Sequence, residues 1–95
     1  TDPSLRKSVI AMTLATRAEA LFVSTLQPSD HPSRHQVQAA ILLSRRTHGG
    51  VIGCAIDFAA EYGEHPEASV DRMRWALGLV AAASAGVGHR TAVAA

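Results

Sequence analysis

This chain of 95 residues has one cysteine, almost no net charge and no long apolar run, and each of these features argues against a class of protein. The single cysteine, Cys54, cannot form an intrachain disulfide, so nothing in the sequence requires an oxidising compartment. A net charge of +1 does not by itself indicate an acidic partner. No apolar run approaches the roughly 20 residues of a membrane span, and the opening residues TDPSLRKS lack a signal-peptide pattern. We therefore expect a cytoplasmic protein that does not enter a membrane.

Alanine supplies much of the hydrophobic content, which is 47% of the chain. Alanine favours helix and lets helices approach closely, but each alanine buries little surface. A thin core in one small domain favours self-association, because a partner adds buried surface. Few aromatic residues are available for the core, and they are Phe22, Phe58, Tyr62 and Trp75.

Helical periodicity of the apolar residues predicts an all-α fold, a small four-helix bundle with short loops. The proline-containing segment QPSDHPS separates the first two helices. Two glycines and many small residues after Ser84 favour a flexible tail over residues 85–95, which leaves residues 1–84 as a single helical domain. The predicted helices cover about residues 2–26, 34–47, 51–62 and 66–84.

Local signals predict where the second helix begins and ends. Ser33 and Gln36 fit a capping box, in which each side chain satisfies a backbone amide of the other residue. Gly49 and Gly50 are expected to end the helix, because glycine adopts the left-handed conformation at low cost. In the third helix, Gly53 lies inside a stripe of apolar residues and indicates close packing or a frayed first turn.

Residues 57–77, DFAAEYGEHPEASVDRMRWAL, resemble the C-terminal helix-turn-helix of bacterial sigma factors and related regulators. In that motif a helix with a small residue ends near a glycine, and a recognition helix with an apolar anchor follows. Here Gly63 would end the first of the two helices and Val70 would be the anchor. The turn is about one residue too long and one residue is missing after Val70, which would rotate the recognition helix. The resemblance implies a DNA-binding regulator built from residues 51–82.

Charge argues against this DNA-binding hypothesis. Glu67 and Asp71 lie early in the predicted recognition helix, where they would face phosphates, whereas groove-reading helices usually carry a basic surplus. Basic residues would compensate only if they gather on one surface. The candidate DNA contacts are Ser69, Arg72, Arg74, Arg45 and Arg46.

Protein–protein association is the leading hypothesis, and we expect a non-catalytic interaction or regulatory module that forms a homodimer through its first or its fourth helix. The interface candidates are Phe22, Trp75 and Leu79. A tryptophan beside leucine and arginine has the composition of an interface hot spot if it is exposed. Burial of Trp75 beneath the first helix, which would complete the core, is the favoured alternative.

Metal binding is a second alternative, and catalysis has little support. The metal candidates of a sensor would be Asp30, His31, His35 and His65. Their spacing is not that of a helical ligand pair, and neither a cysteine pair nor HExxH is present, so we expect cap and loop residues. Cys54 is expected to be a small buried hydrophobe. With no phosphate-binding, dinucleotide or G-x-S-x-G motif, we expect neither enzyme activity nor a cofactor.

The chain as a whole also resembles small alanine-rich helical proteins of high-GC bacteria, and the matching stretches are EALFVSTLQPSDHPS and YGEHPEASVDRMRWA. That resemblance implies a bacterial helical protein. It implies no particular activity.

Overall fold

The computed structural model describes the backbone of residues 14–94 and the side chains of residues 14–83. No strand occurs between residues 14 and 94, and the all-α class is confirmed. The predicted helix start at Asp2 lies outside the described residues. The elements are a helix at residues 14–22, the 3-10 helix η1 (Pro28–Asp30), α2 (Arg34–Thr47), α3 (Gly50–Glu64) and α4 (Pro66–Ala94).

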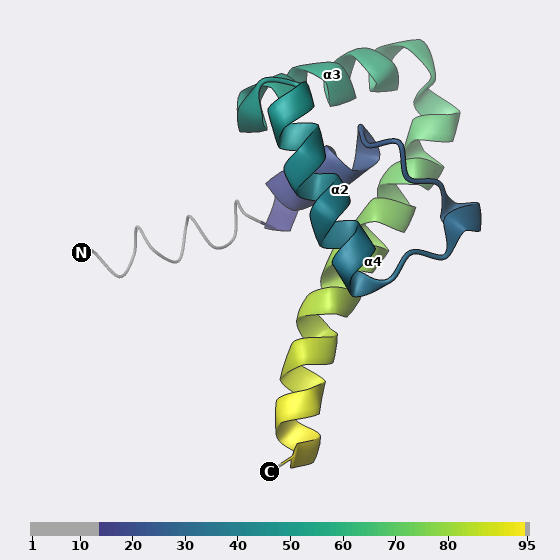
Figure 1. Ribbon diagram of the computed structural model, residues 1–95. Helices are drawn as coiled ribbons and strands as arrows, with labels where there is room; N and C mark the ends of the chain where they lie inside the picture. The colour runs from purple at the N-terminus through teal and green to yellow at the C-terminus, as the bar shows by residue number, and fades with distance from the viewer. Residues whose placement is uncertain (1–13, 95) are drawn as a thin grey trace, which may run out of the picture.

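The helices pack around the helix at residues 14–22, where Ala18, Ala20 and Leu21 are completely buried. α2 and α4 run in opposite directions, and α3 crosses between them at one end of the molecule (Figure 1). The core is built largely of small residues, as the composition predicts. Its other buried hydrophobic residues are Phe22, Val37, Ile41, Cys54, Ala76 and Val80.

α4 continues to Ala94 and so includes most of the segment for which a flexible tail is predicted. Its last turns extend beyond the other helices (Figure 1). The flexibility of residues 85–95 stays a prediction. Within the described part of the chain, no helix combines the length and the hydropathy that a membrane span requires.

Both predicted signals at the ends of α2 are confirmed. The Ser33 hydroxyl accepts from the Gln36 amide at 3.2 Å, and the Ser33 amide donates to the Gln36 side chain at 2.7 Å. Gly49 and Gly50 have φ angles of 86° and 81°, the left-handed region that favours glycine. These two glycines let the chain reverse between α2 and α3.

Gly53 marks a close approach between the start of α3 and the end of α2. A Cβ atom at this position would lie 1.5 Å from the carbonyl oxygen of His48. Of the two interpretations of this glycine, the structure therefore supports close packing.

Gly63 does not end α3, which corrects the prediction from the sequence. The amide of His65 donates to the carbonyl of Glu61 at 2.8 Å, so the helical hydrogen bonding passes through Gly63. Pro66 stops the helix, because proline has no amide hydrogen and disfavours a helical conformation at the residue before it. Only His65 separates α3 from α4.

Candidate functional site

The side chain of Arg72 fastens α4 to the segment that follows the first helix. Its Nε donates to the carbonyl of Phe22 at 2.7 Å, and its Nη2 donates to those of Ser24 at 3.0 Å and Leu26 at 2.9 Å. We call this set of contacts the Arg72 junction. Burial lowers the pKa of Arg72 and the charge of Glu61 opposes that effect, yet the guanidinium stays charged because its ordinary pKa is so high.

The Arg72 junction explains why the first helix is shorter than predicted. The sequence predicts helix to about Leu26, but the helical residues end at residue 22. The hydroxyl of Ser24 donates to the carbonyl of Leu21 at 2.6 Å, and the amide of Leu26 donates to the Ser24 hydroxyl at 3.3 Å. The carbonyl of Phe22 and the amide of Leu26, which would bind each other in a longer helix, therefore bind side chains instead. The Ser24 amide donates to the carbonyl of Leu21, three residues back, at 3.1 Å.

The three interface candidates pack within the chain to different degrees. Phe22 is 3% exposed, and its ring meets the edge of Phe58 at a centroid distance of 4.9 Å. Phe22 is thus closed to a partner in this conformation, which corrects its assignment. Trp75 and Leu79 are half-buried against the core, and the guanidinium of Arg72 lies 4.8 Å from the centre of the Trp75 ring.

One of the candidate DNA contacts is buried, and the others lie on two different helices. Ser69 is 2% exposed, and its hydroxyl donates to the carbonyl of Glu61 at 3.3 Å. Ser69 and Arg72 lie one turn apart on α4, and the polar groups of both side chains bind backbone carbonyls of the same chain. Their role in DNA binding stays a prediction. Arg74 is exposed on α4, whereas Arg45 and Arg46 are exposed in the last turn of α2.

The metal candidates are not brought together either. The carboxylate of Asp30 accepts from the amide of Gln27 at 2.8 Å and caps η1. His31 follows η1 with a φ of 47°, and His35 is exposed in the first turn of α2. His65 lies between α3 and α4, near carboxylates of α3 only. Among the residues described, no three His, Cys, Asp or Glu side chains are placed to hold a metal ion.

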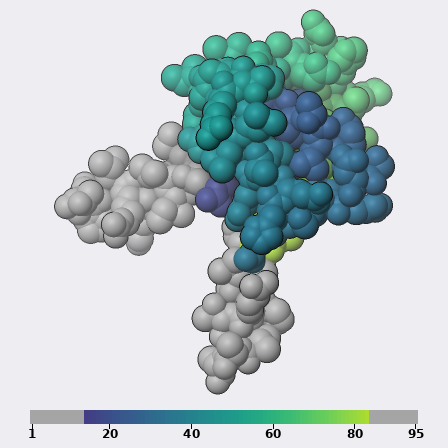
Figure 2. Space-filling model, in the orientation of Figure 1, coloured from purple at the N-terminus to yellow at the C-terminus, as the bar shows by residue number. Residues whose placement is uncertain are grey.

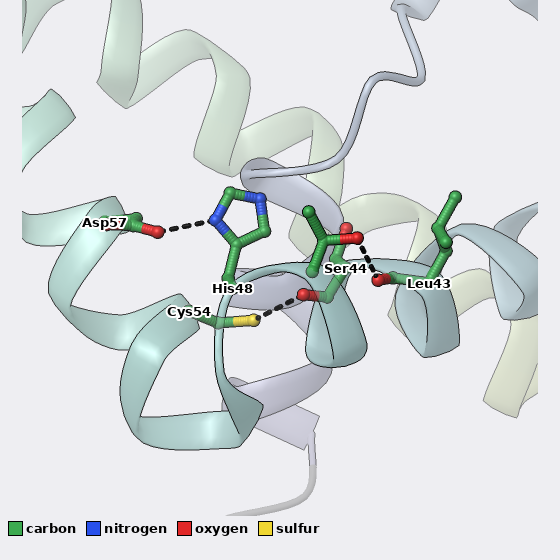
Figure 3. A network of polar contacts seen from close by, with 6 residues as sticks. Leu43, Ser44, His48, Cys54 and Asp57 are labelled. Atoms are coloured by element: carbon green, nitrogen blue, oxygen red, sulfur yellow. Dashed lines mark hydrogen bonds and ion pairs between the residues drawn. The ribbon is translucent and has the colours of Figure 1, made fainter.

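A polar cavity of about 380 Å³ lies beside the Arg72 junction. On its wall, Nδ1 of His48 and the carboxylate of Asp57 are 2.5 Å apart and join the end of α2 to α3 (Figure 3). The sequence analysis missed this pair, because nine residues across a turn is not a recognised spacing. The lining residues are Phe22, Val23, Ser24, Gln27, His48, Asp57, Glu61 and Arg72.

The polar groups around this cavity already bind other parts of the chain. A histidine held by a carboxylate is the arrangement of a general base. The Ser24 hydroxyl on the cavity wall, however, donates to the carbonyl of Leu21. Cys54 is 1% exposed and its Sγ donates to the carbonyl of Ser44 at 3.6 Å (Figure 3). Burial and then Asp57 raise the pKa of Cys54 while Arg45 lowers it, so the unreactive thiol form is favoured.

The side of α3 that faces away from Cys54 is apolar and uncovered. We call Ile52, Ile56, Ala59 and Gly63 the α3 outer face. Ile52 is 75% exposed and Ile56 is 62% exposed, and Ala59 and Gly63 are also exposed. α3 lies along the top edge of the molecule (Figure 1), and its atoms form part of the upper outline of the surface (Figure 2).

The spacing on the α3 outer face is that of a helix–helix seam. Successive members are separated by four, three and four residues, the alternation that positions a and d of a coiled coil produce. The positions beside this seam are also uncharged: Gly53, Ala55, Ala60 and Tyr62. The acidic residues of α3 lie on its other sides. Sequence reasoning found the apolar stripe of this helix but not that it faces outward.

Comparison of the chain with protein-family models, with curated proteins and with solved structures gives no match. The resemblances to sigma-factor helix-turn-helix motifs and to proteins of high-GC bacteria stay predictions. The geometry of the described residues therefore carries the functional argument.

Proposed function

We propose that this protein is a small non-catalytic helical module that acts by protein–protein association through the α3 outer face. The observation that carries the proposal is the exposure of Ile52 and Ile56, at 75% and 62%, on a strip with no charged residue. Full burial of an isoleucine side chain contributes about 1.5–3 kcal/mol relative to exposure. A partner that covers both residues would recover part of that free energy.

A protein helix suits the α3 outer face better than the other partner classes predicted. DNA binding depends on cations that neutralise phosphates, and this strip has none. The exposed Arg74 lies on a different helix from Arg45 and Arg46. Alternation of four and three residues, with small side chains at one end, is typical of surfaces on which a second helix packs. The regulatory role and the cytoplasmic location stay predictions from the sequence.

Photo-cross-linking tests this proposal. A benzoylphenylalanine introduced in place of Ile56, in the cells that produce the protein, should cross-link the chain to a protein upon irradiation. The matched control carries the same residue in place of Ala39, which is exposed on α2. If both positions give equal cross-linking, or neither gives any, the α3 outer face is not an association surface and the proposal fails.

A further inference from the structure

We infer that the partner of the α3 outer face is a second copy of this chain, packed in antiparallel orientation about a two-fold axis. The inference rests on the proposed function and names its partner. It depends on two features of α3: the gradient of side-chain size along the α3 outer face, and the distribution of charge between the two ends of the helix.

Side-chain size decreases along the α3 outer face in the direction of the chain, from Ile52 and Ile56 to Ala59 and Gly63. In an antiparallel pair, Ile52 would lie opposite Gly63 of the partner subunit, and Ile56 opposite Ala59 of the partner subunit. Each large residue meets a small one, so the spacing between helices is even along the seam. A parallel pair would place large on large at one end and small on small at the other, and the helices would splay.

Charge favours the same orientation. Arg45 and Arg46 are exposed in the last turn of α2, and two residues connect that turn to the start of α3. The far end of α3 carries Glu64, and Glu67 follows in the first turn of α4. Antiparallel pairing brings the basic end of each copy toward the acidic end of the other, and it opposes the two helix dipoles.

The length of the seam limits the strength of this dimer. Residues 52–63 span about 18 Å of helix. We expect a contact of that length to bury less than the roughly 800 Å² per partner of a standard interface. We therefore expect a weak dimer that dissociates on dilution. The isologous arrangement also closes at two copies, because both subunits use the same face.

Sedimentation equilibrium of complementary charge variants tests both the partner and its orientation. Ile56→Lys and Ala59→Glu should each weaken self-association by at least about tenfold, since a charge enters an apolar seam. Mixed in equal amounts, the two variants should form a heterodimer, because Lys at position 56 of one chain then lies opposite Glu at position 59 of the other. Ala39→Lys adds the same charge on exposed α2 and should leave the wild-type dissociation constant unchanged.

Three results would overturn the inference. The first is a wild-type protein that stays monomeric up to about 1 mM, a concentration at which even a weak dimer is populated. The second is a mixture of the two charge variants that stays monomeric, because only the antiparallel register pairs residue 56 with residue 59. The third is weakening by Ala39→Lys equal to that by Ile56→Lys. Circular dichroism confirms that each variant is folded before its mass is measured.

The cross-linking experiment separates this inference from the proposed function. A cross-linked product from position 56 with twice the mass of the chain supports both. A product that contains a different protein supports the proposed function and contradicts the second copy. Absence of any specific product contradicts both.

Discussion

The Arg72 junction and the α3 outer face differ in whether their chemical groups find partners within the chain. At the junction, one side chain satisfies three backbone carbonyls, and all of the partners belong to the same chain. At the α3 outer face, two isoleucines are left more than half exposed. The chain thus meets its polar requirements internally, while part of its apolar surface is left without a partner.

This difference indicates where function resides in the molecule. Among the described residues, no buried side-chain nitrogen or oxygen lacks a hydrogen-bond partner. Polar groups that are satisfied within the chain have little free energy to gain from a ligand, whereas exposed isoleucines gain by being covered. The contrast favours association through α3 over recognition by Arg72 or Ser69.

Removal of the Arg72 side chain should strongly destabilise the fold, because it removes every contact of the Arg72 junction. Arg72→Ala leaves three carbonyls without their charged donor, and we expect a loss of about 3 kcal/mol in the free energy of unfolding. For a domain of this size such a loss lowers the Tm by roughly 12–24 °C. Urea denaturation followed by circular dichroism measures it.

Arg74→Ala is the matched control for this prediction, because Arg74 is exposed on the same helix. Its effect should lie within about 0.5 kcal/mol of zero. Equal losses for Arg72→Ala and Arg74→Ala would show that the junction does not hold the first helix against α4.

A methyl group at Gly53 should also lower the free energy of unfolding. The added Cβ would overlap the carbonyl oxygen of His48, so the α2–α3 connection must shift, and we expect Gly53→Ala to cost about 2 kcal/mol. Gly78→Ala is the control, because Gly78 lies inside α4 and a Cβ there has no atom within 4 Å. Inside a helix that change should stabilise the protein by about 0.5–1 kcal/mol. Opposite signs for the two glycines in thermal unfolding are expected, and the same sign would contradict the packing described.

Signals contained in a few adjacent residues were the predictable part of this fold. The capping box of Ser33 and Gln36 and the left-handed Gly49 require only neighbours in sequence, and both are confirmed. The end of the first helix was not predictable in this way. It depends on Arg72, which is 46 residues or more from the carbonyls it binds.

The sequence also does not predict which side of a helix faces the core, and α3 illustrates the physical reason. This helix has apolar residues on two sides, Cys54 with Phe58 on one and Ile52 with Ile56 on the other. Periodicity identifies both stripes but does not decide which packs against the core. Tertiary contacts, including the packing of Phe58 on Phe22, decide it. The burial of Ser69 was not predictable for the same reason, because the orientation of α4 also depends on tertiary contacts.

Truncation of two isoleucines compares the core directly with the α3 outer face, because the same atoms are removed at both positions. Ile41, on α2, is 7% exposed, and Ile41→Ala should cost about 2–5 kcal/mol because it leaves a cavity in the core. Ile52 is 75% exposed, so Ile52→Ala should change the stability of the monomer by less than about 0.5 kcal/mol. Urea denaturation of dilute protein measures the two variants without the contribution of a dimer.

The dependence of Tm on protein concentration then distinguishes Ile41 in the core from Ile52 on the α3 outer face. A subunit that folds and associates gains stability from its partner by mass action. Raising the concentration should therefore increase the Tm of the wild type and of Ile41→Ala, but much less that of Ile52→Ala. Equal concentration dependence in the two variants would mean that Ile52 is exposed in the dimer as well, and that the large residues of α3 do not hold the copies together.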